Sequence, residues 1–486
     1  MDAFIKAYLE RLSDREAYVP IFSKSPNTSK RYIISESITE TIKGQKGTKS
    51  PEKIKCKSLY LIDAIIRESL RLSPDGMKKE CPLNASILHS VIGKDYKVLI
   101  DTLHELGYLE LGGYEIGKHS QLYILPEHLE YDTIEVINKR IFDYKQKTLS
   151  LISKFKEENT YSHIDRIFGD GFVKNYLSSL NLIKIEDKKG FNEYEKKRIK
   201  ENPSSYIYYR YVYNELCSST KVIDKIDAYS GAFRIYHILT NLKRELKSFL
   251  NIEFSLDASN SQPLLFNLLI FDYFNIDYIS SYNLLSFLNK NNVDISKYHY
   301  DCKKLRKYLK TNYIEFSSFA DIKSDVIWYL YLTSTGQLWD WLSDRTGVER
   351  DELKTGMFAQ VFYTNKVQVF KNQKLAILFS EHFPTVMRLI KRWKKTPIPD
   401  DIKSYIEQNK IYPKSENGAL AIAMQQKESM LMGAILKRLY KKGWKALNIH
   451  DCIIIPKSRG KQPSREEVLT IMNDVYQSFG LVATFK

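Results

Sequence analysis

The stretch KALNIHDCIIIP, from Lys445 to Pro456, places two polar residues inside a run of aliphatic and β-branched side chains. Such a run predicts a buried strand, yet His450 and Asp451 lie at its centre. An ionised carboxylate in such a place costs several kcal/mol unless a positive group lies against it. The sequence therefore predicts a partner for Asp451 elsewhere in the chain.

The charge balance of the chain favours a polyanionic partner. The 486 residues include 74 Lys plus Arg against 58 Asp plus Glu, a formal net charge of +16, and the basic residues are spread along the whole length. That balance is typical of proteins that bind nucleic acid. The 34 Tyr and 23 Phe would supply flat faces on which bases stack. The alternative is an organism whose proteins are Lys-rich in general.

Cysteine usage and hydropathy predict a protein of a reducing compartment. The five cysteines are scattered and form no CxxC pair, so neither a disulfide framework nor a zinc ribbon is indicated. No apolar run approaches the roughly 20 residues of a bilayer span, and the start MDAFIKAYLERLSDRE is charged rather than built like a signal peptide. We therefore expect a soluble, cytoplasmic protein without membrane contact.

The first quarter of the chain predicts a linker followed by a compact module. Residues 1–52 end in a Gly/Lys/Ser/Pro-rich stretch, which indicates an exposed N-terminal segment and linker. Residues 53–127 read as three helices and then two short strands joined by a glycine turn. This order resembles a winged helix-turn-helix, which implies DNA-phosphate contacts by Lys94, Lys97 and Lys118. A structural or protein-binding winged helix is the alternative.

The first candidate partner of Asp451 is a second carboxylate. In NIEFSLDASNSQPLLFNLL, from Asn251 to Leu269, Asp257 ends an alternating strand and precedes a helix that begins near Pro263. A strand fixes the backbone of such a residue while the side chain opens into a cleft, which suits a metal ligand. Taken alone, the same pattern is typical of a helix N-cap or an Asx turn.

The second candidate partner of Asp451 is a predicted helix that carries both basic and aromatic residues. In VERDELKTGMFAQVFYTN, from Val348, two cations and two aromatics recur every four residues and so lie on one predicted helix face: Arg350, Lys354, Phe358 and Phe362. Together they would offer charge for a triphosphate and a flat surface for a base. The alternative is an amphipathic helix whose phenylalanines lie in the core.

In this order the three segments resemble motifs A, B and C of the family A nucleic-acid polymerases, which include bacterial DNA polymerase I and the single-subunit RNA polymerases of phages and mitochondria. Motif A is matched by Asp257, and motif C, a His-Asp hairpin among aliphatics, by His450 and Asp451. Motif B has the spacing Arg, three residues, Lys, three residues, aromatic, three residues, Tyr. The residues at that spacing here are Arg350, Lys354, Phe358 and Phe362.

Two further segments support the resemblance, which covers roughly residues 230–486. The family carries an Arg before motif A with Asn-Leu seven residues later, as Arg234 and Asn241 do here, and that Arg approaches the primer end. A Gln-containing helix precedes motif C, and this chain offers Gln425 or Gln426. The resemblance implies an α+β, multidomain right-hand polymerase, with an antiparallel palm sheet and helical fingers and thumb.

The resemblance also implies domain boundaries. The interval between Asp257 and Arg350 is 350 − 257 = 93 residues, longer than is usual in the family, so we expect an insertion in the fingers. The expected segments after the winged helix are a helical thumb-like or connecting region at 128–230, palm with motif A at 231–270, fingers with motif B at 271–400, and palm with motif C at 401–486.

The resemblance further implies the roles of the site residues. Asp257 and Asp451 would share two Mg²⁺ ions, or Mn²⁺, about 3.5 to 4 Å apart, and the cations would offset the two like charges. Arg350 and Lys354 would hold the β- and γ-phosphates, while Phe358 and Phe362 would stack on the incoming and template bases. The residues expected at the primer and template are Arg234, Asn241, Gln425, Gln426 and His450.

Three departures from the family pattern leave the choice of sugar open. Cys452 stands where DNA polymerases have Glu after His-Asp, and Phe362 replaces a Tyr whose hydroxyl takes part in checking the sugar. Gln262, five residues after Asp257, replaces a Glu that blocks the ribose 2′-hydroxyl. Gln262 is therefore an expected nucleotide-binding residue, and its identity leaves the choice between ribose and deoxyribose open.

The sequence as a whole predicts a DNA-directed DNA polymerase that takes a primer-template and nucleoside triphosphates. No acidic set resembling a proofreading exonuclease precedes residue 230, and a winged helix suggests recruitment to particular DNA, as a plasmid, phage or integrated element needs. One alternative is an RNA-synthesising primase or transcriptase, because of Gln262. Another is a catalytically inactive DNA-binding replication initiator, although both carboxylates and both helix cations remain.

Overall fold

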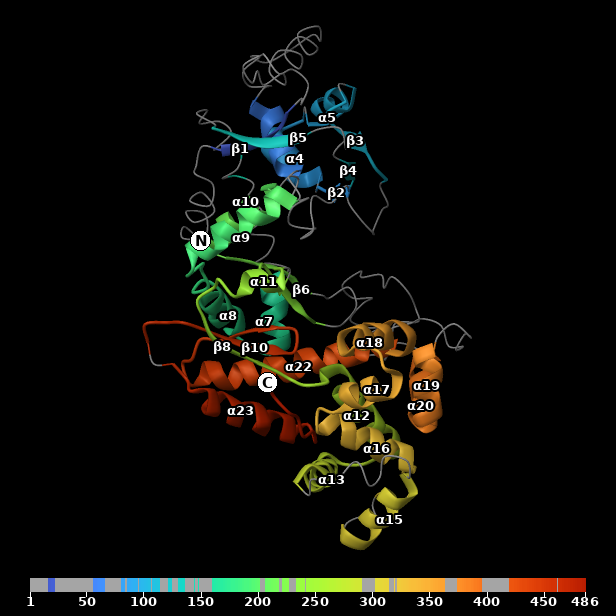
Figure 1. Cartoon of the computed structure of the whole chain (residues 1–486). Helices are drawn as coiled ribbons and strands as arrows, with labels where there is room; N and C mark the ends of the chain where they lie inside the picture. The colour runs from blue at the N-terminus through green and yellow to red at the C-terminus, as the bar shows by residue number, and fades with distance from the viewer. Residues whose placement is uncertain are drawn as a thin grey trace. The chain divides into compact units, whose positions relative to one another are not determined.

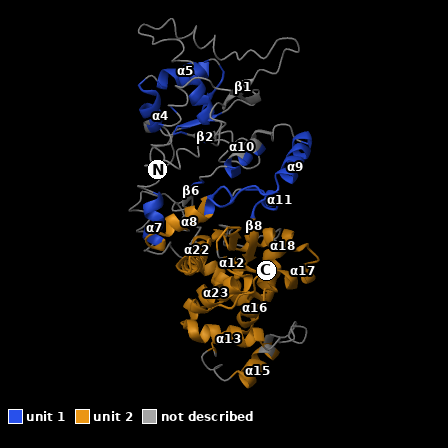
Figure 2. Cartoon of the chain, turned by 90° about the vertical axis from the view of Figure 1, so that its left-hand side faces the viewer, with its two compact units in different colours: residues 1–167, 180–224, 237–251 blue, residues 168–179, 225–236, 252–486 orange. Residues whose placement is uncertain are grey.

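The chain forms two compact units, which are described separately. Unit 1 contains residues 1–167, 180–224 and 237–251, and unit 2 contains residues 168–179, 225–236 and 252–486 (Figure 2). The computed structural model describes residues 16–21, 56–65, 80–83, 85–94, 96–105, 107–113, 121–124, 130–135, 144, 147, 160–201, 206–217, 221–226, 233–240, 242–290, 302–313, 319, 321–362, 374–395, 419–460 and 462–486.

The first part of unit 1 follows the element order predicted for residues 53–127, with one additional strand. Residues 56–65 are helical, and then come β2 (Glu80–Pro82), α4 (Ala85–Ile92), α5 (Tyr96–Glu105), β3 (Glu110–Leu111) and β4 (Leu122–Ile124). The three strands form an antiparallel sheet in the order β2-β4-β3. The inward face of α5 carries Leu99, Ile100 and Leu103, in one apolar cluster with the preceding helices.

Two of the three lysines predicted to contact DNA lie in the described part of this module. Lys94 is in the turn before α5 and Lys97 is in its first turn, and both are exposed. Lys118 lies outside the described residues. Their contact with DNA remains a prediction.

The described residues in the remainder of unit 1 form one strand pair and four helices. Strand β1 (Glu16–Ile21) pairs antiparallel with β5 (Glu130–Glu135). The helices are α7 (Ser162–Phe168), whose last residue belongs to unit 2, α9 (Lys188–Glu201), α10 (Tyr206–Cys217) and α11 (Arg244–Lys247). Asn251 accepts from the backbone of Lys184 at 2.7 Å and donates to the carbonyl of Leu182 at 3.0 Å. Two of the divisions between the units fall within β6 (Ile223–Ile226) and β7 (Ile235–His237).

A three-stranded antiparallel sheet forms the centre of unit 2. Its strands are β8 (Ile252–Asp257), β9 (Leu447–Ile449) and β10 (Cys452–Pro456), in the order β8-β10-β9. Cys452 lies opposite Asp257 on one side and Ile449 on the other. The stretch around Asp451 is therefore a hairpin, as the resemblance implied, and not one continuous strand, because the chain reverses at His450, whose φ of 54° is left-handed.

Unit 2 is mostly helical, with a small antiparallel sheet. They are α8 (Phe172–Leu180), α12 (Ser261–Phe274), α13 (Tyr278–Lys290), α15 (Cys302–Asn312), α16 (Ser324–Ser334), α17 (Leu338–Thr346), α18 (Arg350–Met357), η4 (Phe358–Phe362), α19 (Lys374–His382), α20 (Pro384–Lys395), α22 (Ala419–Lys441) and α23 (Arg465–Ser478). Helices α12 and α16 are buried on nearly all sides, which is typical of interior helices.

The long helix α22 carries functional side chains to the sheet. Its 23 residues are mainly Ala, Leu, Met, Lys and other strong helix formers, and it packs against α12, α20 and α23. Figure 1 shows β8 and β10 beside α22 and α23. A Cβ at Gly433 would overlap the ring of Phe168, so the glycine permits a close approach in the middle of the helix.

The boundaries of the two units differ from the predicted segments. Residues 237–251, expected in the palm, belong to unit 1, whereas the three segments that resemble motifs A, B and C all lie in unit 2. Among the described helices none is long and apolar enough to cross a bilayer. Four cysteines are described with their side chains, and none of them forms a disulfide: Cys56, Cys81, Cys217 and Cys452.

Candidate active site

The first carboxylate of the site, Asp257, is fixed through its backbone. Its N–H donates to the carbonyl of Lys486 at 3.1 Å, and the Lys486 N–H donates to the carbonyl of Asp257 at 3.0 Å. The next residue, Ala258, forms a bridge with Phe485. With β10 on one side and the C-terminal segment adjacent, the backbone is held while the Asp257 side chain is exposed at the strand end.

The second carboxylate, Asp451, lies in the turn that connects β9 and β10. It is half-buried, and it precedes Cys452, the residue paired with Asp257. Burial, followed by the negative charges of Glu428 and Asp257, raises the pKa of Asp451 to about 7, and Lys354 acts in the opposite direction. Like charges have this effect only at short range, so Glu428 and Asp257 lie close enough to Asp451 to repel its charge.

The third carboxylate, Glu428, was not identified from the sequence. It lies on α22 with 2% of its surface exposed. Its Oε1 accepts from Arg234 Nε at 3.0 Å and from Nη2 at 2.7 Å, and its Oε2 accepts from Gln262 Nε2. Burial raises the pKa of Glu428, whereas Arg234 and Gln262 lower it. The half-buried Arg234, expected at the primer end, is here the ion-pair partner of Glu428, and its contact with a primer remains a prediction.

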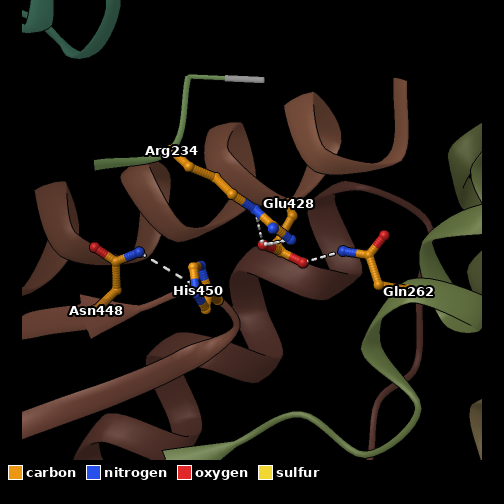
Figure 3. A network of polar contacts seen from close by, with 5 residues as sticks. All are labelled: Arg234, Gln262, Glu428, Asn448 and His450. Atoms are coloured by element: carbon orange, nitrogen blue, oxygen red, sulfur yellow. Dashed lines mark hydrogen bonds and ion pairs between the residues drawn. The ribbon is translucent and has the colours of Figure 1, made fainter. Parts of the chain in front are cut away.

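Figure 3 shows how these side chains meet. Arg234 reaches Glu428 from the segment before β7, and Gln262 reaches it from the first turn of α12. The turn at His450 lies beside them, and its carbonyl accepts from Asn448 Nδ2 at 3.1 Å. Two segments that are far from α22 in the sequence, those of Arg234 and Gln262, therefore converge on the buried carboxylate of Glu428.

A weak signal for Glu428 was present in the sequence. The segment AMQQKESMLMGAIL is apolar apart from a short polar run, and Glu428 lies three residues after Gln425, which places both on neighbouring positions of a helix. An acid in such a setting suggests a buried partner. Its pairing with Arg234 could not be foreseen, because the two residues are 194 positions apart.

The helix predicted to carry both cations and both aromatics changes its geometry halfway. Arg350 and Lys354 belong to α18, and Arg350 Nε lies 2.9 Å from Asp340 Oδ1. Phe358 and Phe362 belong to η4, a π-helical turn. The prediction of a single face is therefore wrong, because a π turn contains more residues than an α turn and rotates the later side chains away.

That rotation places the two aromatics differently. Lys354 is exposed and Phe358 half-buried, but Phe362 is 1% exposed. The ring of Phe362 contacts Phe266 and Phe379, with centroids 6.3 and 6.1 Å apart. Phe362 is thus a core side chain in this structure, and its stacking on a base remains a prediction.

A buried lysine supports the π turn. Lys394, on α20, is 6% exposed and its Nζ donates to the carbonyl of Val361 within η4. Burial, followed by the charge of Lys391, lowers the pKa of Lys394 to about 8. A π turn disturbs the regular hydrogen bonds of the helix backbone, and Lys394 provides a donor at that place.

The other predicted primer and template residues lie near the same turn or outside the described residues. Gln425 and Gln426 are half-buried on α22. The ring of His450 lies edge-on to Tyr236, with centroids 6.0 Å apart. Cys452 is half-buried, and Asn241 lies outside the described residues.

The charge of the site fits a divalent cation, but its ligand set is incomplete. Three mutually repelling carboxylates leave negative charge that a cation would offset. However, Glu428 is engaged by Arg234 and Gln262, and no group of three described His, Cys, Asp or Glu side chains is arranged to hold an ion. Asp257 and Asp451 are the two residues that would bind one.

Comparisons with known proteins gave one structural neighbour. No protein family matches the sequence, and no curated protein matches it. Among solved structures, the chain is similar to the POL domain of Pol1 from M. smegmatis in complex with DNA primer-template and dNTP. The identity is 11%, the match covers 71% of this chain and 72% of that chain, and the TM-score is 0.23. At that TM-score the similarity establishes neither a shared fold nor a shared activity.

Proposed function

We propose that this chain is a template-directed nucleotidyltransferase, which extends a nucleic-acid primer on a DNA template with deoxynucleoside triphosphates. The observation that carries the proposal is the meeting of Asp257, Asp451 and Glu428, from three separate segments, close enough to Lys354 on α18 for its charge to act on Asp451. Acidic residues close together are costly for folding. Such a cluster is typical of sites that bind metal and phosphate.

Asp257 and Asp451 would hold Mg²⁺, which when bound lowers the pKa of an attacking hydroxyl and offsets charge on a phosphoryl group. The residues of the chain position the reactants. Lys354, which is exposed and close enough to affect the pKa of Asp451, would bind phosphate oxygens of the nucleotide. The exposed tip of Asp257 and the turn at Asp451 leave the primer hydroxyl an approach to the site.

The test is extension of a labelled primer on a DNA template with Mg²⁺, comparing the wild type with Asp257→Asn and Asp451→Asn. We expect extension by the wild type and a loss of at least about a hundredfold in each variant, because a metal ligand is removed. Asp474→Asn is the matched control, since Asp474 is an exposed acid on α23 of the same unit. Binding of DNA without extension in any buffer would instead support the inactive initiator.

We further propose that residues 53–127 recruit the enzyme to DNA, as replication of a mobile element would need. The exposed lysines Lys94 and Lys97 support this assignment. Replacing both with glutamate should weaken DNA binding by the whole chain and reduce the salt dependence of that binding by about two counterions. An unchanged salt dependence would contradict the assignment.

A further inference from the structure

Helix α15 carries a strongly basic face outside the candidate active site. Five of its 11 residues are Lys or Arg, and none is Asp or Glu. Its four lysines, Lys303, Lys304, Lys307 and Lys310, are all exposed. Because residues three and four positions apart share one side of a helix, Lys303, Lys307 and Lys310 follow a single line along it. Figures 1 and 2 show α15 at the end of unit 2 that is away from β8.

The opposite face of α15 is held by its neighbours in unit 2. Leu309 is 0% exposed, and the ring centroids of Tyr308 and Phe287 on α13 are 6.4 Å apart. The helix also packs against α16. The fifth cation, Arg306, is half-buried and donates through Nη1 to the carbonyl of Ile322. The packed side therefore fixes the helix, and the four lysines are the charge that it presents outward.

The elements around α15 add little negative charge. Helix α13 contains no Asp or Glu, and the acids closest to α15 in the sequence, Asp301 and Glu315, lie outside the described residues. Asp325, on α16, accepts from a backbone N–H of α20 at 2.6 Å. Asp321 adjoins the residue whose carbonyl Arg306 binds. The exposed face of α15 is thus a concentrated positive charge.

The chemistry of this face identifies the kind of partner. A helix that binds a membrane surface must expose an apolar side, but the described apolar side chains of α15 face its neighbours. Proteins that bind single strands offer aromatic rings on which bases stack, and Tyr308 is turned inward. Lysine is a compact point charge that suits phosphate and lacks the fork with which arginine reads base edges.

We propose that the four lysines of α15 bind phosphates of double-stranded DNA without reading its sequence. Positions 303 to 310 span about 10 Å of helix axis. One strand of B-DNA carries a phosphate about every 3.4 Å of its axis, so the face can meet about three phosphates of one strand and a fourth beside them. This contact goes beyond the proposed function, on which it rests only in taking DNA as the partner.

The test is binding of the full-length protein to a labelled duplex of arbitrary sequence, followed by fluorescence anisotropy over a range of salt concentrations. The variant combines Lys303→Gln, Lys304→Gln, Lys307→Gln and Lys310→Gln, because glutamine keeps the helix propensity and removes the charge. We expect weaker binding and a plot of log K against log salt that is shallower by about three to four, since each lost phosphate contact removes about 0.9 from the slope.

Two controls separate this contact from general effects of charge and folding. Arginine at the same four positions keeps the charge, so the slope should return to that of the wild type. Removing four charges from α9 changes the net charge equally, but α9 also carries three acids and should affect the slope much less. That variant combines four exposed positions: Lys188→Gln, Lys189→Gln, Lys196→Gln and Lys197→Gln.

The outcomes distinguish this inference from the proposed function. An unchanged slope in the α15 glutamine variant, or an equal change in the α9 variant, would overturn the role of α15. A loss confined to a single-stranded oligonucleotide would overturn the assignment to duplex DNA. Binding requires no catalysis, so a wild type that binds duplex DNA through α15 but extends no primer would leave this inference in place and overturn the proposed function.

Discussion

The guanidinium of Arg234 places two of its nitrogens, Nε and Nη2, within 3.0 and 2.7 Å of the same oxygen of Glu428. Charge-assisted bonds of this kind are stronger than neutral ones. The pair joins the segment before β7 to the middle of α22, and Gln262 completes it from α12. The integrity of the site therefore depends on a buried charge whose compensation comes from distant parts of the chain.

Arg234→Ala should destabilise unit 2 strongly. It leaves Glu428 buried without its cation, and removal of one partner of a buried ion pair costs roughly 3 kcal/mol or more. Urea unfolding followed by tryptophan fluorescence reports on unit 2 alone, because all five tryptophans belong to it: Trp328, Trp339, Trp341, Trp393 and Trp444.

Lys427→Ala is the matched control for that measurement. Its ion pair with Asp272 is partly exposed, with an N–O distance of 3.9 Å, so its loss should change the unfolding free energy by no more than about 0.5 kcal/mol. Equal effects of the two variants would show that the Arg234–Glu428 pair is not buried in solution.

Asp451→Asn should make the protein more stable at neutral pH without divalent cations. The folded-state pKa of Asp451, about 7, lies above the unfolded value of 3.8, so the folded state binds the extra proton. Stability attributable to this group is therefore complete below pH 4 and is lost as the pH rises to about 7. The asparagine side chain of the variant does not ionise, so the variant does not lose stability in this way as the pH rises.

The measurement is the melting temperature of wild type and Asp451→Asn from pH 4 to 8 in EDTA. We expect the advantage of the variant to be greatest near pH 8 and to shrink toward pH 4. A wild type whose stability rises with pH, relative to the variant, would contradict the raised pKa.

Magnesium should stabilise the wild type at pH 8. A ligand that binds only the folded state stabilises it by about 1.4 kcal/mol at ten times its dissociation constant, and here the cation also relieves repulsion between carboxylates. The melting temperature should rise with MgCl₂ and much less with KCl at equal ionic strength. If Asp257→Asn and Asp451→Asn respond to MgCl₂ as the wild type does, the two residues do not bind the metal.

Lys354→Ala should reduce kcat/KM for nucleotide addition by about ten- to a hundredfold, since one charged hydrogen bond contributes roughly 1.5 to 3 kcal/mol. Lys354 is exposed on α18, so the folded state should tolerate the change. Glu352→Gln tests an equally exposed neighbour on the same helix and should change the rate little. Equal losses in both variants would mean that Lys354 has no specific part in nucleotide binding.

The site was predictable from the sequence where local chemistry is unusual. Asp257 and Asp451 could be singled out because a carboxylate beside an apolar strand needs a compensating group. The register of β8 and β10 pairs Asp257 with Cys452, the residue that follows Asp451. The helical character of unit 2 also follows from apolar periodicity, which depends on residues three and four positions apart. Such signals depend only on residues that are close together in the sequence, so they can be detected without a structure.

Other features depended on contacts that no local pattern contains. The π turn at Phe358 to Phe362 moves Phe362 into the core. It is a choice of backbone geometry that tertiary packing imposes against the simplest periodicity.

The sequence by itself determined which residues carry charge and chemistry: the two aspartates, the cations of α18 and the basic balance of the chain. Only the tertiary structure decided that Arg234 pairs with Glu428, and that this pair fixes the amide of Gln262. The physical reason is the sequence separation between the residues that interact. Burial and periodicity are properties of neighbouring residues, whereas an ion pair between positions 194 residues apart exists only once the chain has folded.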